Sequence, residues 1–293
     1  MRIYVGTYER FVLGYEFKTD ENEEYACEEL FTNNSSLGIV KTVAVSQSGK
    51  MLAAGGTDEM VWLFDLKRNQ ELGNVIPQCG TILKLQFCDS DHTLIAASSD
   101  GLVVIDTKSW SCVKNFPIVN LLDTAIHHSN RLAVTADGSR FLRTWNLCKG
   151  SQIHSLRLKS GPTLVTWSPC GTMLTVISKS YLDFRNIETG DRTAAIQLPG
   201  AVHCAEFLSK SLLICGLSGS NNLVLLSTSG KVLFEMEAHK NRTKAITVMS
   251  ETQFISVGSD GFIKLWKYEN SSFKLLTQVN TKCRLTSVCG KIT

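Results

Sequence analysis

Apolar and alternating runs of about four to eight residues follow one another along the whole chain, and short turn sequences separate them. In residues 243–279 the runs are KAITVM, QFISVG, FIKLWKY and SFKLLTQV, and the turns SET, SDG and ENS divide them. Runs of this length, bounded by such turns, predict β-strands joined in hairpins. No stretch keeps a helical period, so the pattern predicts an all-β protein.

Four such runs make a unit, and the unit recurs with a nearly constant period. A period of about 40–45 residues is typical of the four-stranded blades of a β-propeller. The residues near the end of each third run lie 40 or 41 positions apart, at Phe64, Ile105, Trp145, Arg185, Leu226 and Trp266. Complete blades are predicted at residues 39–76, 80–118, 121–158, 162–199, 201–237 and 243–279.

A further unit is divided between the two ends of the chain. Residues 1–32, which include GTYERFVLGYEF, supply three predicted strands, and RLTSVCG within residues 281–293 resembles the innermost strands of the other units. A blade exposes two faces and needs a neighbour on each side, so the first and last units must meet. We therefore predict one seven-bladed propeller over residues 1–293, closed by pairing the C-terminal strand with the N-terminal strands.

Composition limits the remaining possibilities. Hydrophobic residues are 43% and charged residues 19% of the 293, which suits a chain with a buried core. No uninterrupted apolar run of about 18 residues occurs, and the start lacks a secretory pattern, so no membrane association is expected. The ten cysteines form no CxxC pair, which indicates a reducing compartment, cytosol or nucleus.

Charge is unevenly distributed along the chain. Residues 16–29 hold seven acids and one lysine, a net charge of −6. Because the whole chain has a net charge of +3, the remaining residues carry +9. Such a surplus favours an anionic partner, although an ordinary solvated surface is the alternative. The acidic stretch 20–29 is predicted between the third and fourth strands of the closing blade.

Catalytic and metal-binding patterns are missing from the sequence. It has no GxSxG motif and no phosphate-binding glycine loop in a strand-to-helix context. His127 and His128 are adjacent, and adjacent residues on a strand point to opposite faces, which argues against a metal site there. We therefore predict a protein that is not an enzyme and that has no cofactor and no metal.

One aspartate pattern is specific. An Asp stands six residues before the aromatic residue of the third strand in GTDEMVWLF and GSDGFIKLW, where it caps the turn after the second strand. In the last complete unit, His239, Ser256, Asp260 and Trp266 match the buried hydrogen-bonded tetrad of WD repeats. For His239 the alternative is a ligand or a base. Asp100 and Asp137 are offset, and the fourth and fifth units lack the aspartate.

Beyond the general WD pattern, the chain resembles the p21-activated-kinase-interacting protein family of nucleolar WD-repeat proteins. Relatives in that family carry a lysine-rich C-terminal tail. This sequence stops at Thr293, so nucleolar targeting or RNA binding by such a tail is not expected from it. The stretches that carry the resemblance span nearly the whole chain and are GTYERFVLGYEF at 6–17, LRTWNL at 142–147, VTWSPCGTM at 165–173, AHKNRTK at 238–244, SDGFIKLWK at 259–267 and NTKCRLTSV at 280–288.

A basic cluster, HKNRTK at 239–244, is predicted to form the loop that leads into the last complete blade. In propellers such loops share one face with the loops between second and third strands, where Arg140, Lys179 and Ser180 stand. Clustered Lys and Arg suit phosphates or an acidic peptide, and a plain solvated loop is the alternative. The candidate partner contacts are Lys240, Arg242, Lys244, Arg140 and Lys179.

The resemblance implies a scaffold, monomeric within a larger complex, that acts in the nucleus and nucleolus during assembly of the 60S ribosomal subunit precursor. Its partners would be pre-60S proteins and possibly rRNA. The alternative is a signalling adaptor that binds and negatively regulates p21-activated kinase. The sequence does not separate these two functions, because one rigid surface can serve both.

Overall fold

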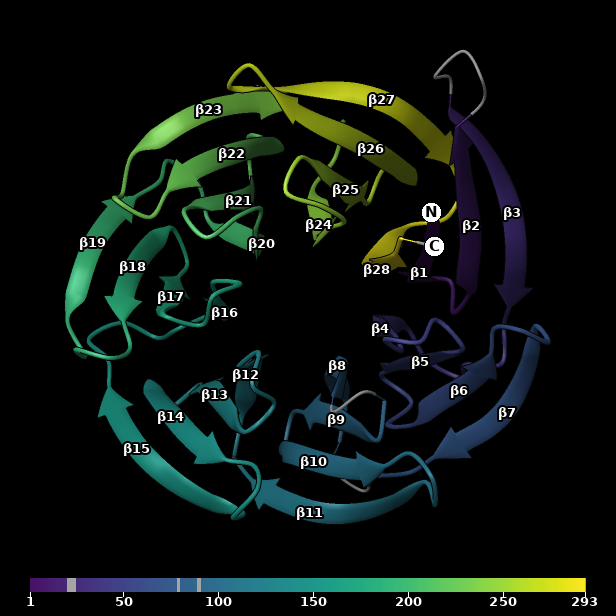
Figure 1. The fold of residues 1–293 in the computed structure, drawn as a ribbon, viewed down its shortest axis with the longest axis horizontal. Helices are drawn as coiled ribbons and strands as arrows, with labels where there is room; N and C mark the ends of the chain where they lie inside the picture. The colour runs from purple at the N-terminus through teal and green to yellow at the C-terminus, as the bar shows by residue number, and fades with distance from the viewer. Residues whose placement is uncertain (20–24, 78–79, 89–90, 293) are drawn as a thin grey trace.

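The computed structural model describes residues 1–19, 25–77, 80–88 and 91–292 and forms a closed ring of seven four-stranded antiparallel sheets (Figure 1). The prediction of an all-β, seven-bladed propeller is thus confirmed. Within the described ranges, no helix is long and apolar enough to cross a membrane.

The first three complete blades occupy one side of the ring, and in each the strands run outward from the centre in chain order. Blade 1 contains β4 (Val40–Val45), β5 (Met51–Gly56), β6 (Val61–Asp65) and β7 (Gln70–Val75). Blade 2 contains β8 (Ile82–Cys88), β9 (Thr93–Ser98), β10 (Gly101–Asp106) and β11 (Ser111–Pro117). Blade 3 contains β12 (Leu121–Ile126), β13 (Leu132–Asp137), β14 (Phe141–Asn146) and β15 (Ser151–Arg157).

The next three blades continue the ring in the same way. Blade 4 contains β16 (Leu164–Trp167), β17 (Met173–Ser178), β18 (Tyr181–Asn186) and β19 (Arg192–Gln197). Blade 5 contains β20 (Val202–Phe207), β21 (Leu212–Leu217), β22 (Asn222–Ser227) and β23 (Val232–Glu237). Blade 6 contains β24 (Thr243–Val248), β25 (Gln253–Gly258), β26 (Phe262–Glu269) and β27 (Ser272–Asn280).

Blade 7 joins the two ends of the chain. Its innermost strand β28 pairs with β1, with Arg2 opposite Lys291 and Gly6 opposite Ser287. The strands from the centre outward are β28 (Leu285–Lys291), β1 (Arg2–Thr7), β2 (Val12–Thr19) and β3 (Tyr25–Asn33). Closure of the ring by the C-terminal strand is therefore confirmed.

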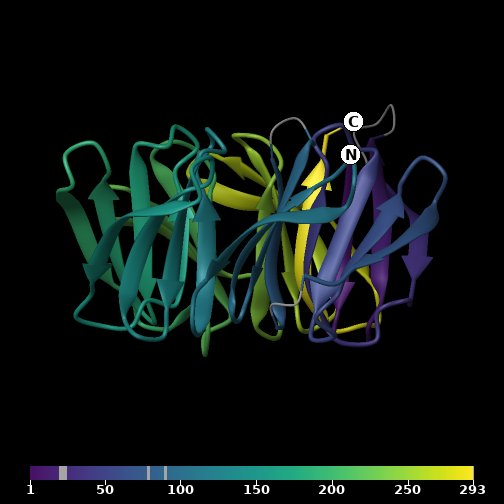
Figure 2. The same cartoon turned by 90° about the horizontal axis from the view of Figure 1, so that it is seen from below.

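Polar contacts strengthen this closure where the two ends of the chain meet. The Nε of Arg284 donates to Glu9 Oε1 at 2.9 Å, and the backbone N–H of Arg284 donates to the other oxygen at 2.9 Å. The Arg284 guanidinium also lies 3.9 Å from the centre of the Tyr8 ring. Both termini lie side by side near one face of the ring (Figures 1 and 2).

The loops divide between the two faces of the ring seen edge-on in Figure 2. We call junction face the face that carries the loops between blades and the loops between second and third strands. The hairpin face carries the loops between first and second and between third and fourth strands, together with the two termini. Backbone hydrogen bonds tie the loops of the junction face together, for example Leu158 N–H to Arg140 O at 2.8 Å.

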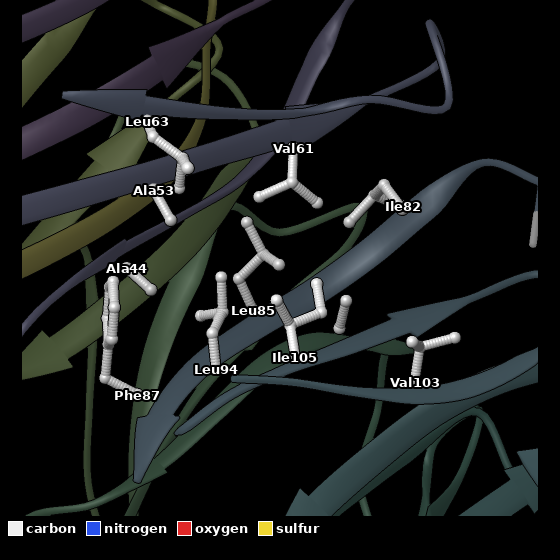
Figure 3. Close-up of a cluster of buried hydrophobic side chains, with 11 residues drawn as sticks. Ala44, Ala53, Val61, Leu63, Ile82, Leu85, Phe87, Leu94, Val103 and Ile105 are labelled. Carbon is white, nitrogen blue, oxygen red and sulfur yellow. The ribbon is translucent and has the colours of Figure 1, made fainter. Parts of the chain in front are cut away.

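The core consists of apolar clusters that fill the seams between neighbouring blades. Figure 3 shows the cluster between blades 1 and 2, where Val61 and Leu63 of β6 meet Leu85 of β8 and Val103 and Ile105 of β10. Among the described residues, the cluster between blades 3 and 4 is the smallest, with seven buried members against nine to eleven in the other six. The seam between blades 3 and 4 is thus the least filled with apolar side chains.

Candidate functional site

Four side chains of blade 6 form a hydrogen-bonded chain that runs inward from the junction face. His239 Nδ1 lies 3.0 Å from Asp260 Oδ1, and His239 Nε2 lies 2.8 Å from Ser256 Oγ. Trp266 Nε1–H donates to Ser256 Oγ at 2.8 Å. His239 is 1% and Trp266 2% exposed, so the chain lies in the core. Both ring nitrogens of His239 are thus engaged, one by Asp260 and the other by Ser256, which gives this histidine a positioning role.

The carboxylate of Asp260 holds the turn around it. Burial raises the pKa of Asp260, but the hydrogen bond and charge of His239 and the N–H groups of Phe262 and Lys240 outweigh it, so the pKa is lower than usual. The Lys240 N–H donates to Asp260 Oδ2 at 3.0 Å, and Asn221 Nδ2 donates to the Lys240 carbonyl at 3.0 Å. The backbone beneath the Lys240 side chain is therefore fixed, while the side chain itself is exposed.

Not all of the predicted basic loop is a loop. Lys240 and Arg242 are exposed and lie in the loop between β23 and β24. Lys244, in contrast, lies in β24, as the extra residue of a bulge between Thr243 and Ala245. It is half-buried, and burial, followed by the charge of Arg242, lowers its pKa. Lys244 was predicted both in the basic loop and at the start of the run KAITVM; the strand is confirmed, and its place in the loop was wrong.

Arg140 and Lys179 occupy the turns between the second and third strands of blades 3 and 4. Both have left-handed backbone, with φ of 69° and 54°, and both are exposed. The Lys179 carbonyl accepts from Val202 N–H at 2.9 Å. Together with Lys240 and Arg242, these side chains spread over blades 3 to 6 of the junction face rather than gathering at one point.

Lys159 extends this basic surface and was missed in the sequence. It is exposed in the segment that connects blades 3 and 4, between the turns that hold Arg140 and Lys179. Its only sequence signal was one lysine in a short Gly-Pro-containing connection. We call the five exposed cations the basic arc: Arg140, Lys159, Lys179, Lys240 and Arg242.

The inner wall of the ring carries a second polar group that sequence reasoning missed. Lys84 of β8 donates from Nζ to the Thr124 carbonyl at 2.7 Å and lies 3.3 Å from Asp123 Oδ1. The other oxygen of Asp123 accepts from Val165 N–H at 2.9 Å, which links β12 to β16. Glu206 of β20 touches solvent, but the protein that surrounds it on the inner wall removes part of its solvation and raises its pKa to about 7; the charge of Lys84 opposes this rise and that of Asp123 adds to it.

Other blades replace parts of the tetrad. In blade 1, Asp58 Oδ2 accepts from Trp62 Nε1 at 2.8 Å and from Ser36 Oγ at 3.0 Å. In blade 3, Trp145 Nε1 donates to Thr135 Oγ1 at 2.9 Å, the counterpart of the Trp266–Ser256 bond. The ten-residue spacing of Thr135 and Trp145 equals that of Ser256 and Trp266, whereas the partners of Asp58 do not follow the spacing of the tetrad.

The two adjacent histidines lie side by side. His127 and His128 follow the end of β12 in a turn, and their ring centroids are 4.1 Å apart. The expectation that they point to opposite faces was therefore wrong, because it assumed a strand. Among the described residues, no group of three or more His, Cys, Asp or Glu side chains could hold a metal ion.

The acidic stretch is only partly described. Residues 20–24 lie outside the described residues, and 25–29 belong to the outermost strand β3. Within β3, Glu28 accepts from Lys18 Nζ. Part of the acidic stretch is thus paired within blade 7.

The repeat belongs to a known class. The family model described as "WD domain, G-beta repeat" matches residues 27–65 and 230–267. Each matched segment begins in or just before the outermost strand of one blade and ends in the third strand of the next, so repeat and blade differ in phase by one strand. The chain is therefore a WD-repeat β-propeller.

Relatives that match nearly the whole chain identify the family within the WD-repeat class. The chain is 32% identical to the p21-activated protein kinase-interacting protein 1-like protein of Danio rerio, over 99% of the chain and 80% of the relative. It is 29% identical to p21-activated protein kinase-interacting protein 1 of Homo sapiens, over 98% and 76%. Shk1 kinase-binding protein 15 of Schizosaccharomyces pombe is 27% identical, over 91% and 77%. The chain belongs to the p21-activated protein kinase-interacting protein 1 family, as the sequence resemblance indicated.

Proposed function

We propose that this protein is a non-enzymatic scaffold that holds an intermediate in the assembly of the 60S ribosomal subunit precursor, in the nucleolus. The observation that carries the proposal is the basic arc on one face of a closed, rigid ring. Lys and Arg side chains on one face attract and orient phosphate-rich or acidic partners. Family resemblance supplies the ribosomal context, and the ring supplies several loops at once for contact with more than one partner.

The construction of the arc supports a contact role. The tetrad and the Asn221 bond fix the backbone at Lys240 without using its ammonium group. Arg140 and Lys179 hold left-handed backbone, a conformation that costs about 1–2 kcal/mol for a residue other than glycine. Exposed cations on fixed turns lose little conformational freedom on binding, which favours affinity.

The second candidate function is an adaptor that binds p21-activated kinase and negatively regulates it. This candidate is favoured by the names of three relatives. The proteins of Danio rerio, Homo sapiens and Schizosaccharomyces pombe are each named after a kinase that they bind or interact with. The same basic arc would serve an acidic segment of such a kinase. The two functions therefore predict the same residues and differ in the partner.

The experiment is sedimentation of the tagged protein through a density gradient at two salt concentrations, with pre-60S particles followed by their rRNA. Lys240→Glu with Arg242→Glu should reduce co-migration and its salt dependence, because both side chains are exposed. Lys244 is left unchanged because a carboxylate in half-buried β24 would disturb the strand.

The matched control reverses two charges of blade 5 on the opposite face. Lys210 and Lys231 are exposed on the hairpin face, so their replacement by Glu changes net charge equally. Both double variants should keep the wild-type melting temperature, since exposed substitutions cost within about 0.5 kcal/mol each. Equal co-migration of both variants would remove the arc from the contact surface. Wild-type protein that never co-migrates, but captures the kinase in a pull-down, would replace the first function by the second.

A further inference from the structure

The outer half of the seam between blades 3 and 4 is a groove in which charged residues lie beside the apolar Leu156, Leu158 and Val176. Its volume is about 550 Å³, and it runs from the junction face between β15 and β18. We call it the seam groove. The polar residues that line it and enter the argument are Lys159, Tyr181, Asp183, Arg185 and Arg192.

Blade 4 departs from the repeat at the position where the groove forms. Arg185 stands in register with Phe64, Ile105, Leu226 and Trp266, which are 0–2% exposed and fill the corresponding seams. The Arg185 side chain is 23% exposed, and an arginine at this depth gains less from packing than an apolar residue would. The apolar cluster of this seam is correspondingly the smallest. A cation kept at a core position of the repeat at the expense of packing indicates a binding role.

The charges in the groove are not balanced. Asp183 is its one acid: Arg185 Nη2 lies 2.7 Å from its Oδ2, and Arg192 Nε lies 2.9 Å from its Oδ1. Lys159 makes no ion pair with any residue that the structure describes. Three cations and one carboxylate leave +2, and most N–H groups of the two paired guanidiniums have no acceptor among the described residues.

We infer that the seam groove binds a phosphate group on a phosphorylated serine or threonine of a partner protein. A phosphate monoester carries about −1.5 to −2 charge and three acceptor oxygens, which match the N–H donors of Lys159, Arg185 and Arg192 along this groove. Recognition of phosphorylated segments by arginine clusters is a common binding mode. This inference does not depend on which of the two proposed partners is correct.

The groove fits a peptide better than RNA. Single-stranded RNA is held by a continuous basic track and by aromatic rings on which bases stack. Tyr181 is the groove's one aromatic ring, and the Arg192 guanidinium already lies over it, 5.2 Å from its centre. Asp183 interrupts the positive track in the middle. One isolated dianion is therefore accommodated, whereas a chain of phosphates with stacked bases is not.

The test uses an arrayed peptide library in which every peptide is present with threonine and with phosphothreonine, probed with the purified full chain. Hits are then measured by fluorescence anisotropy. Phosphorylated hits should bind about tenfold or more tightly than their unphosphorylated forms. Lys159→Glu with Arg192→Glu should abolish that preference, whereas Lys210→Glu with Lys231→Glu, which makes the same charge change in blade 5, should leave it unchanged.

A second variant separates binding from stability. Asp183→Val with Arg185→Leu gives blade 4 the residues that Val224 and Leu226 provide in blade 5. This variant should lose phosphopeptide binding and keep or raise the melting temperature. A library without phosphate-dependent hits overturns the inference, as does equal loss of binding in the blade 5 control. Binding of a single-stranded RNA oligonucleotide that depends on Lys159 and Arg192, without phosphopeptide binding, would assign the groove to RNA instead.

Discussion

Trp266→Ala is expected to lower the free energy of unfolding by about 3–5 kcal/mol. The indole is 2% exposed and stacks on Phe254, with ring centroids 6.3 Å apart and planes inclined by 15°. Burial of about 150–250 Å² at about 25 cal/mol per Å² gives roughly 4–6 kcal/mol as an upper bound. The lost bond from Nε1 to Ser256 Oγ, 2.8 Å long, adds about 1 kcal/mol, and relaxation of neighbouring side chains returns part of the sum.

Two further variants separate the contribution of the buried ring from that of the hydrogen bonds of the tetrad. Trp266→Phe keeps an aromatic ring but removes the donor to Ser256, so it should cost about 1–2 kcal/mol. Asp260→Ala leaves His239 Nδ1 and the Lys240 N–H without their acceptor and should cost about 1–3 kcal/mol. Because both changes touch one hydrogen-bonded chain, their combination should be non-additive.

The assay is urea denaturation followed by far-UV circular dichroism, with the slope of the transition checked in every variant. An exposed change in the same blade, Lys274→Ala, serves as the control and should be nearly neutral. If Trp266→Ala and Asp260→Ala both lie within about 0.5 kcal/mol of the wild type, the tetrad does not stabilise blade 6 and the reasoning fails.

Three other outcomes are expected. Deleting residues 281–293 removes β28 and exposes the edge of β1, so the protein should aggregate or melt far below the wild type, and an equally soluble, equally stable truncation would contradict this. The pKa of Glu206 is about 7 in the folded protein against an ordinary 4.5, so the stability that protonated Glu206 contributes is lost as the pH rises through that interval. Glu206→Gln should remove this part of the pH dependence of the melting temperature. Identical pH profiles of the wild type and the variant would refute the assignment. Hydrogen bonds from Ser168 and Thr172 lower the pKa of Cys170 to about 7, so iodoacetamide at neutral pH should label Cys170 before Cys27, whose pKa burial raises to about 11; mass spectrometry that finds the reverse order would contradict this.

The fold was predictable because it follows from a local pattern and one global requirement. Strand lengths and turns are set by neighbouring residues, and the 40 or 41 residue period repeats them across the chain. A blade buries its faces only against other blades, which forces the ring to close. Asp260 and Trp266 were recognisable for the same reason, since the turn that they stabilise has fixed spacing.

The remaining site residues depend on contacts between distant segments. Lys84 and Asp123 meet across two blades, 39 residues apart in the chain, and no spacing rule connects them. Lys244 lies in strand β24, at a bulge. A bulge adds one residue to a strand without changing the apolar pattern, so the sequence does not reveal it. Arg185 was placed in register by the period, but the groove around it exists only because β15 of the preceding blade lies opposite.

The shared blade also has a consequence for synthesis of the protein. Arg284 and Glu9, which meet in that blade, are 275 positions apart in the chain. Protein synthesis proceeds at about 5–20 residues per second, so roughly 15–55 seconds pass between the synthesis of β1 and that of its partner strand β28. During that interval its inner edge has open backbone donors and acceptors, which are a template for pairing with other chains. We therefore expect the yield of folded protein to fall when this edge is left unprotected during synthesis.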